Sequence, residues 1–280
     1  MYPEAVTLAI VFKGPEGLAL AADSRVTLRA QLPSGETHYS HFDNATKLLS
    51  FQGQPHVGAV IYGSAAIGSP PRTVHGFVPE FEERLSEKYG QGDAPPARGA
   101  VAEIASELGA FYSQQWKQTG MPLPGPGVDP LVFLVAGFDE GDPYGRIYEV
   151  SVPNAPDPVE KNAGTNFGIT WGGQGEMAHR VLSGVDPRAV TIAKDHLGLD
   201  DTQAKTLADK WSTGLALPVP YQFLPLQDCV DLSAFLVNMT SAVQTWTIGI
   251  QGVGGVVDVA TITRTEGFRA IRQKKIEVWE

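Results

Sequence analysis

Two stretches decide the fold: Thr7-Leu8-Ala9-Ile10-Val11-Phe12 and, after a turn at Gly14-Pro15-Glu16-Gly17, Leu18-Ala19-Leu20-Ala21-Ala22-Asp23-Ser24-Arg25-Val26-Thr27. Both are apolar runs of strand length joined by a Pro/Gly turn, so the pattern predicts a β-hairpin. The second run stays apolar through Ala22 and then presents Asp23 and Arg25. Such a strand is typically buried on both faces until it opens onto a polar site. A surface loop with an exposed ion pair is the alternative that these residues alone leave open.

The composition is that of a globular protein with a substantial core. The 280 residues are 42% hydrophobic and 19% charged, which is enough apolar sequence for one large domain. The formal net charge of −10 argues against a nucleic-acid partner, which would require a basic surface; the basic run at 269–275 is short. Cys229 is the single cysteine, and no Cys/His pattern has the spacing of a metal site. We therefore expect no metal and no cofactor.

The first residues do not have the pattern of a targeting segment. No basic region precedes the first apolar run, and Lys13 interrupts that run before it reaches the length of a signal sequence or a membrane span. We expect a cytoplasmic protein without a membrane partner.

The rest of the chain alternates groups of strands with groups of helices. We expect a polar loop over 31–46, strands at 47–51, 57–63, 131–138, 146–150, 167–171, 256–263 and 268–271, and helices at 74–89, 101–112, 202–211 and 232–246. The glycines at 172–175 are interpreted as a tight turn, and 185–228 as an inserted lobe of one domain that spans 1–280. Because βαβ alternation is absent, the order predicts an α+β chain with two sheets between helical layers.

The hairpin and three later motifs resemble one known family. They are Thr7 with 20–27, Lys47-Leu48-Leu49, Ile61-Tyr62-Gly63, and the run from Gly254-Gly255 to Arg264. In these motifs and their order the chain resembles the N-terminal-nucleophile hydrolases, specifically the β-type subunits of the 20S proteasome and bacterial proteasome-like proteins. Asp23 follows Thr7 at a spacing of sixteen positions, as in that family. The resemblance implies a four-layer αββα sandwich of two antiparallel sheets flanked by helices.

The resemblance also implies a catalytic group made of Thr7, Asp23, Lys47 and Gly63. Thr7 becomes the nucleophile after removal of residues 1–6 as a short propeptide, because its own free amine then supplies a base. Lys47 favours the deprotonated hydroxyl, and Asp23 orients Lys47. The backbone N–H of Gly63 stabilises the oxyanion of the tetrahedral intermediate.

The substrate contacts that the resemblance implies are Arg25, Val26, Thr27, Leu49, Ile61 and Ala65. The backbone of Thr27 pairs with an extended peptide, and the apolar side chains predict an apolar residue on the acyl side of the cut. The implied partners are a peptide or unfolded protein as substrate, further copies of the chain in a ring, and an ATP-dependent unfoldase.

The chain departs from the family pattern next to the nucleophile. Val6 stands where the family has glycine, Val253 stands where it has serine, and no serine occurs in 172–175. Two functions therefore stay open: a threonine-type peptidase or amide hydrolase, and a proteasome-like scaffold subunit without proteolytic activity.

Overall fold

The computed structural model describes residues 3–4, 7–31, 34–90, 95–249 and 251–275. The chain forms two compact units, one of Met1–Gly173 with Tyr221–Glu280 and one of Gln174–Pro220. The second unit differs at both ends from the lobe expected at 185–228. It ends earlier because Tyr221 belongs to the first unit, where its ring meets the edge of Phe12 at a centroid distance of 5.7 Å.

The predicted hairpin lies inside a five-stranded antiparallel sheet of the first unit. In spatial order the strands are β13 (Gly168–Gly173), β2 (Leu8–Lys13), β3 (Leu18–Ala22), β14 (Asp258–Thr263) and β15 (Gly267–Arg272). Every residue of β2 and β3 is buried, and the Gly14 N–H donates to Gly17 O across the turn. The hairpin prediction is confirmed. Burial on both faces also explains the apolar composition of these strands.

A second antiparallel sheet of the same unit also has five strands. They are β12 (Ala155–Lys161), β11 (Arg146–Val152), β10 (Leu131–Gly137), β7 (Val57–Gly63) and β6 (Leu48–Ser50). The sequence did not predict β12, since Pro156 and Pro158 are unfavourable in a strand interior. Its place at the sheet edge tolerates both prolines, because an edge strand can leave N–H positions unpaired.

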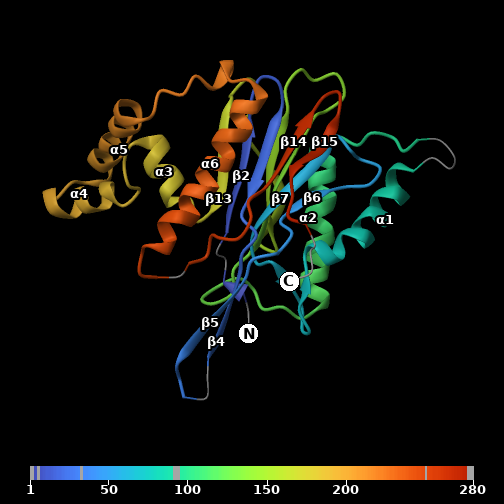
Figure 1. The fold of residues 1–280 in the computed structure, drawn as a ribbon, viewed down its shortest axis with the longest axis horizontal. Helices are drawn as coiled ribbons and strands as arrows, with labels where there is room; N and C mark the ends of the chain where they lie inside the picture. Colours follow the sequence, from blue (N-terminus) through green and yellow to red (C-terminus); the bar gives the residue numbers. More distant parts are fainter. Residues whose placement is uncertain (1–2, 5–6, 32–33, 91–94, 250, 276–280) are drawn as a thin grey trace. The chain divides into compact units, whose positions relative to one another are not determined.

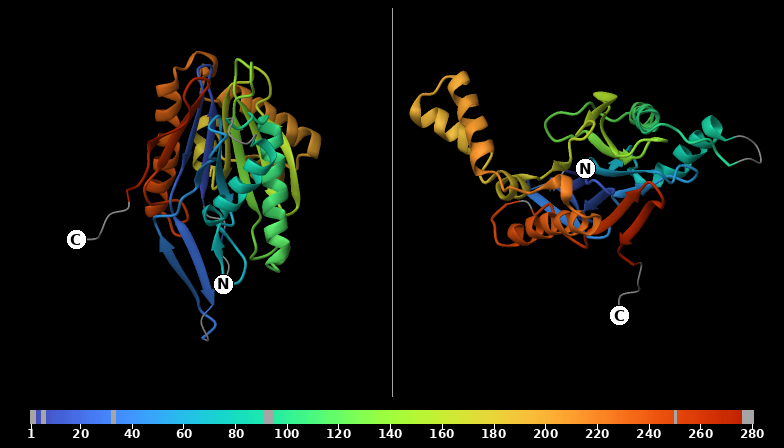
Figure 2. Two further views of the ribbon diagram at one scale, coloured as in Figure 1. Left: turned by 90° about the vertical axis from the view of Figure 1, so that its right-hand side faces the viewer. Right: turned by 90° about the horizontal axis from the view of Figure 1, so that it is seen from above.

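The two sheets share a core, and helices pack on each of them (Figures 1 and 2). One cluster of buried side chains joins Val11 and Leu20 of the first sheet to Val60 and Leu134 of the second. Helix α6 (Leu226–Thr245) contacts β2, β3 and β14. Helices α1 (Val78–Tyr89) and α2 (Val101–Gln118), with the short helix η1 (His75–Phe77), share a second cluster with β7, β10 and β11. The described part of the chain is thus a mixed α/β structure built on antiparallel sheets.

The polar segment 31–46 contains a strand rather than only a loop. Strands β4 (Val26–Gln31) and β5 (Thr37–Phe42) form a hairpin (Figure 1), and β1 (Pro3–Glu4) pairs with the other edge of β4. A two-stranded bridge joins β8 (Ala66–Ile67) to β9 (Arg72–Thr73). The loop prediction was wrong because β5 exposes His38, His41 and Phe42, and so lacks the apolar alternation that marks a half-buried strand.

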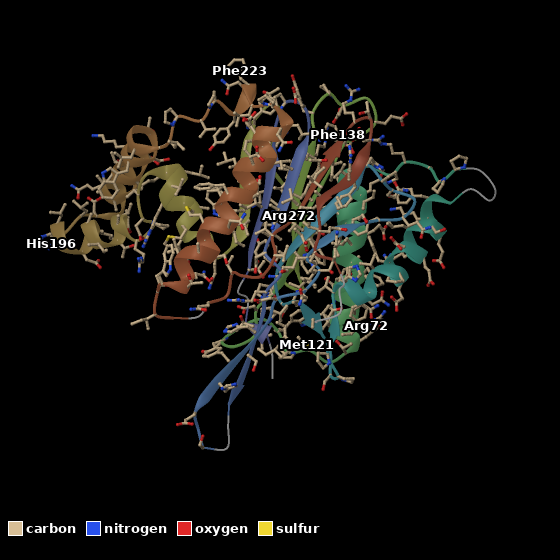
Figure 3. All side chains as sticks on the ribbon, viewed as in Figure 1. Arg72, Met121, Phe138, His196, Phe223 and Arg272 are labelled. Carbon is tan, nitrogen blue, oxygen red and sulfur yellow. The ribbon has the colours of Figure 1, made fainter. Side chains whose placement is uncertain are left out.

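The second unit consists of helices α3 (Glu176–Ser183), α4 (Ala189–Leu197) and α5 (Asp201–Leu215). A capping box of Asp200 and Gln203 begins α5. The first unit resumes with the short helix η2 (Tyr221–Phe223), whose Phe223 is exposed (Figure 3). Among the helices described, each is too short or too polar to cross a bilayer.

Candidate functional site

Lys47 joins three chain segments at one end of the sheets. Its Nζ donates to Thr7 Oγ1 at 2.7 Å, to Asp23 Oδ1 at 2.9 Å and to Arg25 O at 2.6 Å. Thr7 immediately precedes β2, Asp23 follows β3, and Lys47 precedes β6. The structure therefore brings together three of the four residues that the sequence singles out as catalytic. Each is at most 4% exposed, so water competes little for these contacts.

Asp23 holds the segments around Lys47 in place. Besides Lys47, its carboxylate accepts the N–H of Leu8 at 3.1 Å through Oδ1, and those of Arg25 and Gly254 at 3.1 Å through Oδ2. Burial raises the pKa of Asp23, while the Lys47 ammonium and the backbone donors oppose that rise. This one carboxylate consequently fixes the start of β2, the end of β3 and the loop at Gly254.

The surroundings of Lys47 make its ammonium easier to deprotonate. Burial lowers the pKa of Lys47 below its ordinary value of 10.5; Asp23 counteracts this effect, and the charge of Lys274 adds to it. A neutral Lys47 amine has two N–H donors and one lone pair. Its two acceptors, Asp23 and Arg25 O, match the donors, and the Thr7 hydroxyl matches the lone pair, so this geometry can accept the hydroxyl proton.

Gly63 lies at the end of the strand that runs past Lys47. The Ile61 N–H donates to Lys47 O at 3.0 Å, and β7 ends two residues later at Gly63. Gly63 has a φ of +83°, and a Cβ there would lie 2.0 Å from Pro130 O. Both the left-handed backbone and the close approach require glycine.

Gly172 and Gly173 belong to the site and not to the turn that the sequence suggested. They are the last residues of β13, paired with Ala9 and Leu8 of β2. Gly173 has a φ of +84°, and a Cβ on it would lie 1.8 Å from Thr7 O. Consecutive glycines were the available signal, but the sequence does not reveal which backbone they approach.

Arg25 and Asp43 form a bidentate ion pair beside Asp23. Nε and Nη2 of Arg25 lie 2.6 and 2.8 Å from Asp43 Oδ1 and Oδ2, and Nη1 donates to Gln251 O at 3.2 Å. A Cβ on Gly254 would lie 2.4 Å from the guanidinium. The side chain of Arg25 is thus engaged within the protein, and its carbonyl positions Lys47. Sequence reasoning missed Asp43, which lies in the segment interpreted as a loop.

The expected apolar substrate contacts differ in accessibility. Leu49 and Ile61 are 1% and 2% exposed and belong to the core cluster under α1 and α2. Val26 and Ala65 are half-buried, and Thr27 is buried with its hydroxyl 3.0 Å from His41 Nδ1. Of the expected apolar lining, only Val26 and Ala65 are therefore partly open to a ligand.

The edge of β4 is already paired with the first residues of the chain. Glu4 lies opposite Thr27 and Pro3 opposite Leu28 in antiparallel register. The expected cleavage point, between Val6 and Thr7, involves Val6, which lies outside the described residues. Strand β4 thus accepts an extended segment at the position where a peptide substrate is expected.

Comparison with known proteins supports the fold. No protein-family model matches the chain, and no curated protein matches it. Among solved structures, Anbu (ancestral beta-subunit) from Yersinia bercovieri matches with 15% sequence identity and a TM-score of 0.50, over 94% of this chain and 86% of that chain. At this identity the likeness concerns the fold alone: the chain is similar in fold to a proteasome-like protein.

Proposed function

We propose that the chain is a threonine-type peptidase or amide hydrolase with the αββα sandwich of the N-terminal-nucleophile hydrolases. The observation that carries this proposal is the 2.7 Å contact between Lys47 Nζ and Thr7 Oγ1 in a buried site. A threonine hydroxyl is a weak nucleophile until a neighbouring base accepts its proton. A lysine whose pKa is lowered by burial is such a base.

In the proposed reaction Thr7 Oγ1 bonds to the carbonyl carbon of the substrate while its proton moves to Lys47. The backbone N–H of Gly63 stabilises the oxyanion. The carbon–nitrogen bond then breaks, and the leaving amine takes up a proton, which leaves an ester on Thr7. Water attacks the ester and releases the acid, and the hydroxyl of Thr7 regains its proton.

The same groups serve for removal of residues 1–6. Thr7 attacks the Val6 carbonyl, the peptide bond becomes an ester, and water cleaves that ester. The freed amine of Thr7 then provides a second base with an ordinary pKa of about 7.7–8.0. The branched side chain of Val6 stiffens the backbone before the attack, which slows this step relative to glycine.

An extended peptide is the substrate that the site favours. Strand β4 pairs with Glu4, which precedes Thr7 by three residues, so a peptide whose scissile bond lies at Thr7 can occupy the same edge. On the family resemblance we further propose a homo-oligomeric ring in the cytoplasm that takes unfolded protein from an ATP-dependent unfoldase. Sedimentation of the purified protein tests the ring, and a 30.0 kDa monomer at micromolar concentration would contradict it.

Intact mass and peptide hydrolysis of the wild-type protein test the enzymatic proposal together. We expect a mass that lacks residues 1–6 and turnover of fluorogenic peptides at neutral pH. Retention of residues 1–6 with no turnover would favour the scaffold subunit. The pairing of β1 with β4 favours this second function, because a segment that stays on that edge blocks a substrate.

A further inference from the structure

A cavity of about 480 Å³ lies next to the segment that carries Lys47, because Leu48 is one of its lining residues. Four chain segments line it: the loop before β6, η1, the start of β14 and the segment after Arg272. Arg272 is labelled in Figure 3. Its lining residues are Asn44, Thr46, Leu48, His75, Asp258, Gln273, Lys274 and Lys275. This volume is in the range of small-molecule sites.

The positive charges of this cavity exceed the negative ones. Asp258 is the one acid of the lining, and Lys274 neutralises it: the Lys274 N–H donates to Oδ1 at 2.9 Å, and Nζ to Oδ2 at 2.5 Å. Asp258 is 3% exposed, so this pair is largely withdrawn from water. Lys275 has no ion-pair partner within the described part of the chain, so its ammonium is uncompensated, and His75 adds an exposed imidazole.

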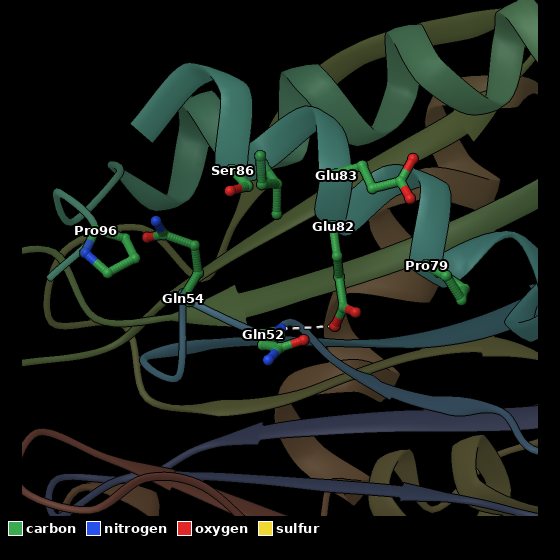
Figure 4. A pocket seen from close by; sticks show the side chains of 9 residues that line it. Gln52, Gln54, Pro79, Glu82, Glu83, Ser86 and Pro96 are labelled. Carbon is green, nitrogen blue, oxygen red and sulfur yellow. Dashed lines mark hydrogen bonds between the residues drawn. The ribbon is translucent and has the colours of Figure 1, made fainter. Parts of the chain in front are cut away.

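This concentration of basic groups contrasts with the rest of the protein. The chain as a whole has a net charge of −10. A hollow of similar size, about 470 Å³, lies between α1 and the segment before β7 and is lined by Glu82 and Glu83 (Figure 4). There Glu82 Oε1 accepts the N–H of Gln52 at 2.6 Å. The two hollows therefore differ in sign, and a concave basic surface concentrates anions.

We propose that the cavity beside Lys274 binds a small phosphate-type oxyanion, either free phosphate or a phosphomonoester. Lys275 supplies a positive charge, the imidazole of His75 supplies a hydrogen-bonding group from a different segment, and Asn44, Thr46 and Gln273 add neutral donors. A carboxylate has only two oxygens to accept hydrogen bonds from these donors, whereas a phosphate group offers three or four. The cavity also leaves room for an organic group attached to the phosphate.

Isothermal titration of the full-length protein tests binding without reference to activity. The titrants are inorganic phosphate, phenyl phosphate and acetate at one ionic strength set with NaCl. We expect saturable binding of one phosphate, weakened about tenfold by Lys275→Gln and by His75→Gln, because one charge-assisted hydrogen bond is lost in each. Lys205→Gln is the matched control, since Lys205 is exposed and outside the lining.

Both variants alter exposed side chains, and unchanged thermal unfolding midpoints will establish that they fold. Tighter binding of phenyl phosphate than of phosphate assigns a phosphomonoester as ligand, and the reverse order assigns free phosphate. The proposal is overturned by an absence of saturable binding, by acetate binding as tightly as phosphate, or by equal weakening in Lys205→Gln. Each result is read independently of whether the protein cleaves peptides.

Discussion

The ammonium of Lys47 lies 2.7 Å from the hydroxyl of Thr7, although the two residues are forty positions apart in sequence. Both side chains are buried, so water competes little for this contact. Asp23 maintains it, because the same carboxylate accepts Lys47 Nζ and the N–H of Leu8, the residue after Thr7. The following predictions test what this arrangement does.

Replacement of the nucleophile separates chemistry from folding. Thr7→Ala should retain residues 1–6 and lose peptide hydrolysis, because no hydroxyl remains to attack either bond. Thr7→Ser is the matched control, since it keeps the hydroxyl next to Lys47 and should keep both activities in reduced form. Intact mass and fluorogenic peptide assays measure the two effects. Full processing of Thr7→Ala would assign the nucleophile to another residue.

The pH dependence of hydrolysis should report the lowered pKa of Lys47. Burial lowers that pKa below 10.5, and the neutral amine is the form that accepts a proton, so the rate should rise with pH through a step below 10.5. Lys47→Arg keeps the charge but does not deprotonate, and should reduce kcat/KM by about 10²- to 10⁴-fold. A pH profile of kcat/KM measures both. If Lys47→Arg retained the wild-type rate and step, the base would be a different group.

Asp23→Asn should destabilise the fold as well as the site. An amide cannot accept all four hydrogen bonds of the carboxylate, and it leaves the buried Lys47 charge without its partner. Breaking a buried ion pair in this way costs about 3–5 kcal/mol of unfolding free energy. Denaturant titration measures it, with Asp209→Asn on exposed α5 as the control. Equal stability of the two variants would mean that Asp23 does not support the fold.

Gly173→Ala should displace Thr7. The added Cβ would lie 1.8 Å from Thr7 O, and the left-handed φ of +84° strains alanine as well. Gly120→Ala isolates the backbone strain, because Gly120 has a φ of +68° with no atom within 4 Å of the added Cβ. We expect about 1–2 kcal/mol of destabilisation for Gly120→Ala and more for Gly173→Ala. Thermal or denaturant unfolding compares them, and equal losses would show that the contact with Thr7 relaxes freely.

Cleavage should favour small aliphatic residues on the acyl side of the cut. Val26 and Ala65 are the half-buried part of the expected lining, while Leu49 and Ile61 are taken up by the core. A charged side chain placed against this apolar surface loses hydration without gaining a partner. Peptides with Val or Ala should therefore turn over faster than peptides with Arg or Glu. The opposite ranking would mean that the pocket is misassigned.

Sequence alone predicted the elements that carry strong apolar patterns. The hairpin of β2 and β3 and the helices α1, α2 and α6 were expected because burial dictates their composition. Strands β5 and β12 were missed because one exposes polar side chains and the other contains prolines, and backbone pairing at an edge overrides both signals. The strand propensity of a segment does not indicate which sheet edge is available for it to pair with.

The same distinction holds for the candidate site. Motif order led to Thr7, Asp23 and Lys47, which lie together, while their catalytic roles stay predictions. The partner of Arg25 and the closeness of Gly173 to Thr7 were not predictable, because each depends on the exact approach of backbones that are far apart in sequence. Sequence spacing carries no information about such distances.

The glycine pair that ends β13 also restricts how this site can evolve or be redesigned. The resembled family has a serine near the nucleophile, but at position 172 any side chain meets the Tyr62 ring 2.1 Å from its Cβ, and at position 173 it meets the Thr7 carbonyl oxygen. A single-step mutation to serine is therefore sterically blocked at these two positions. Substitutions at Tyr62 and in the β13–β2 ladder would have to come first, so the effect of a serine here depends strongly on the residues around it.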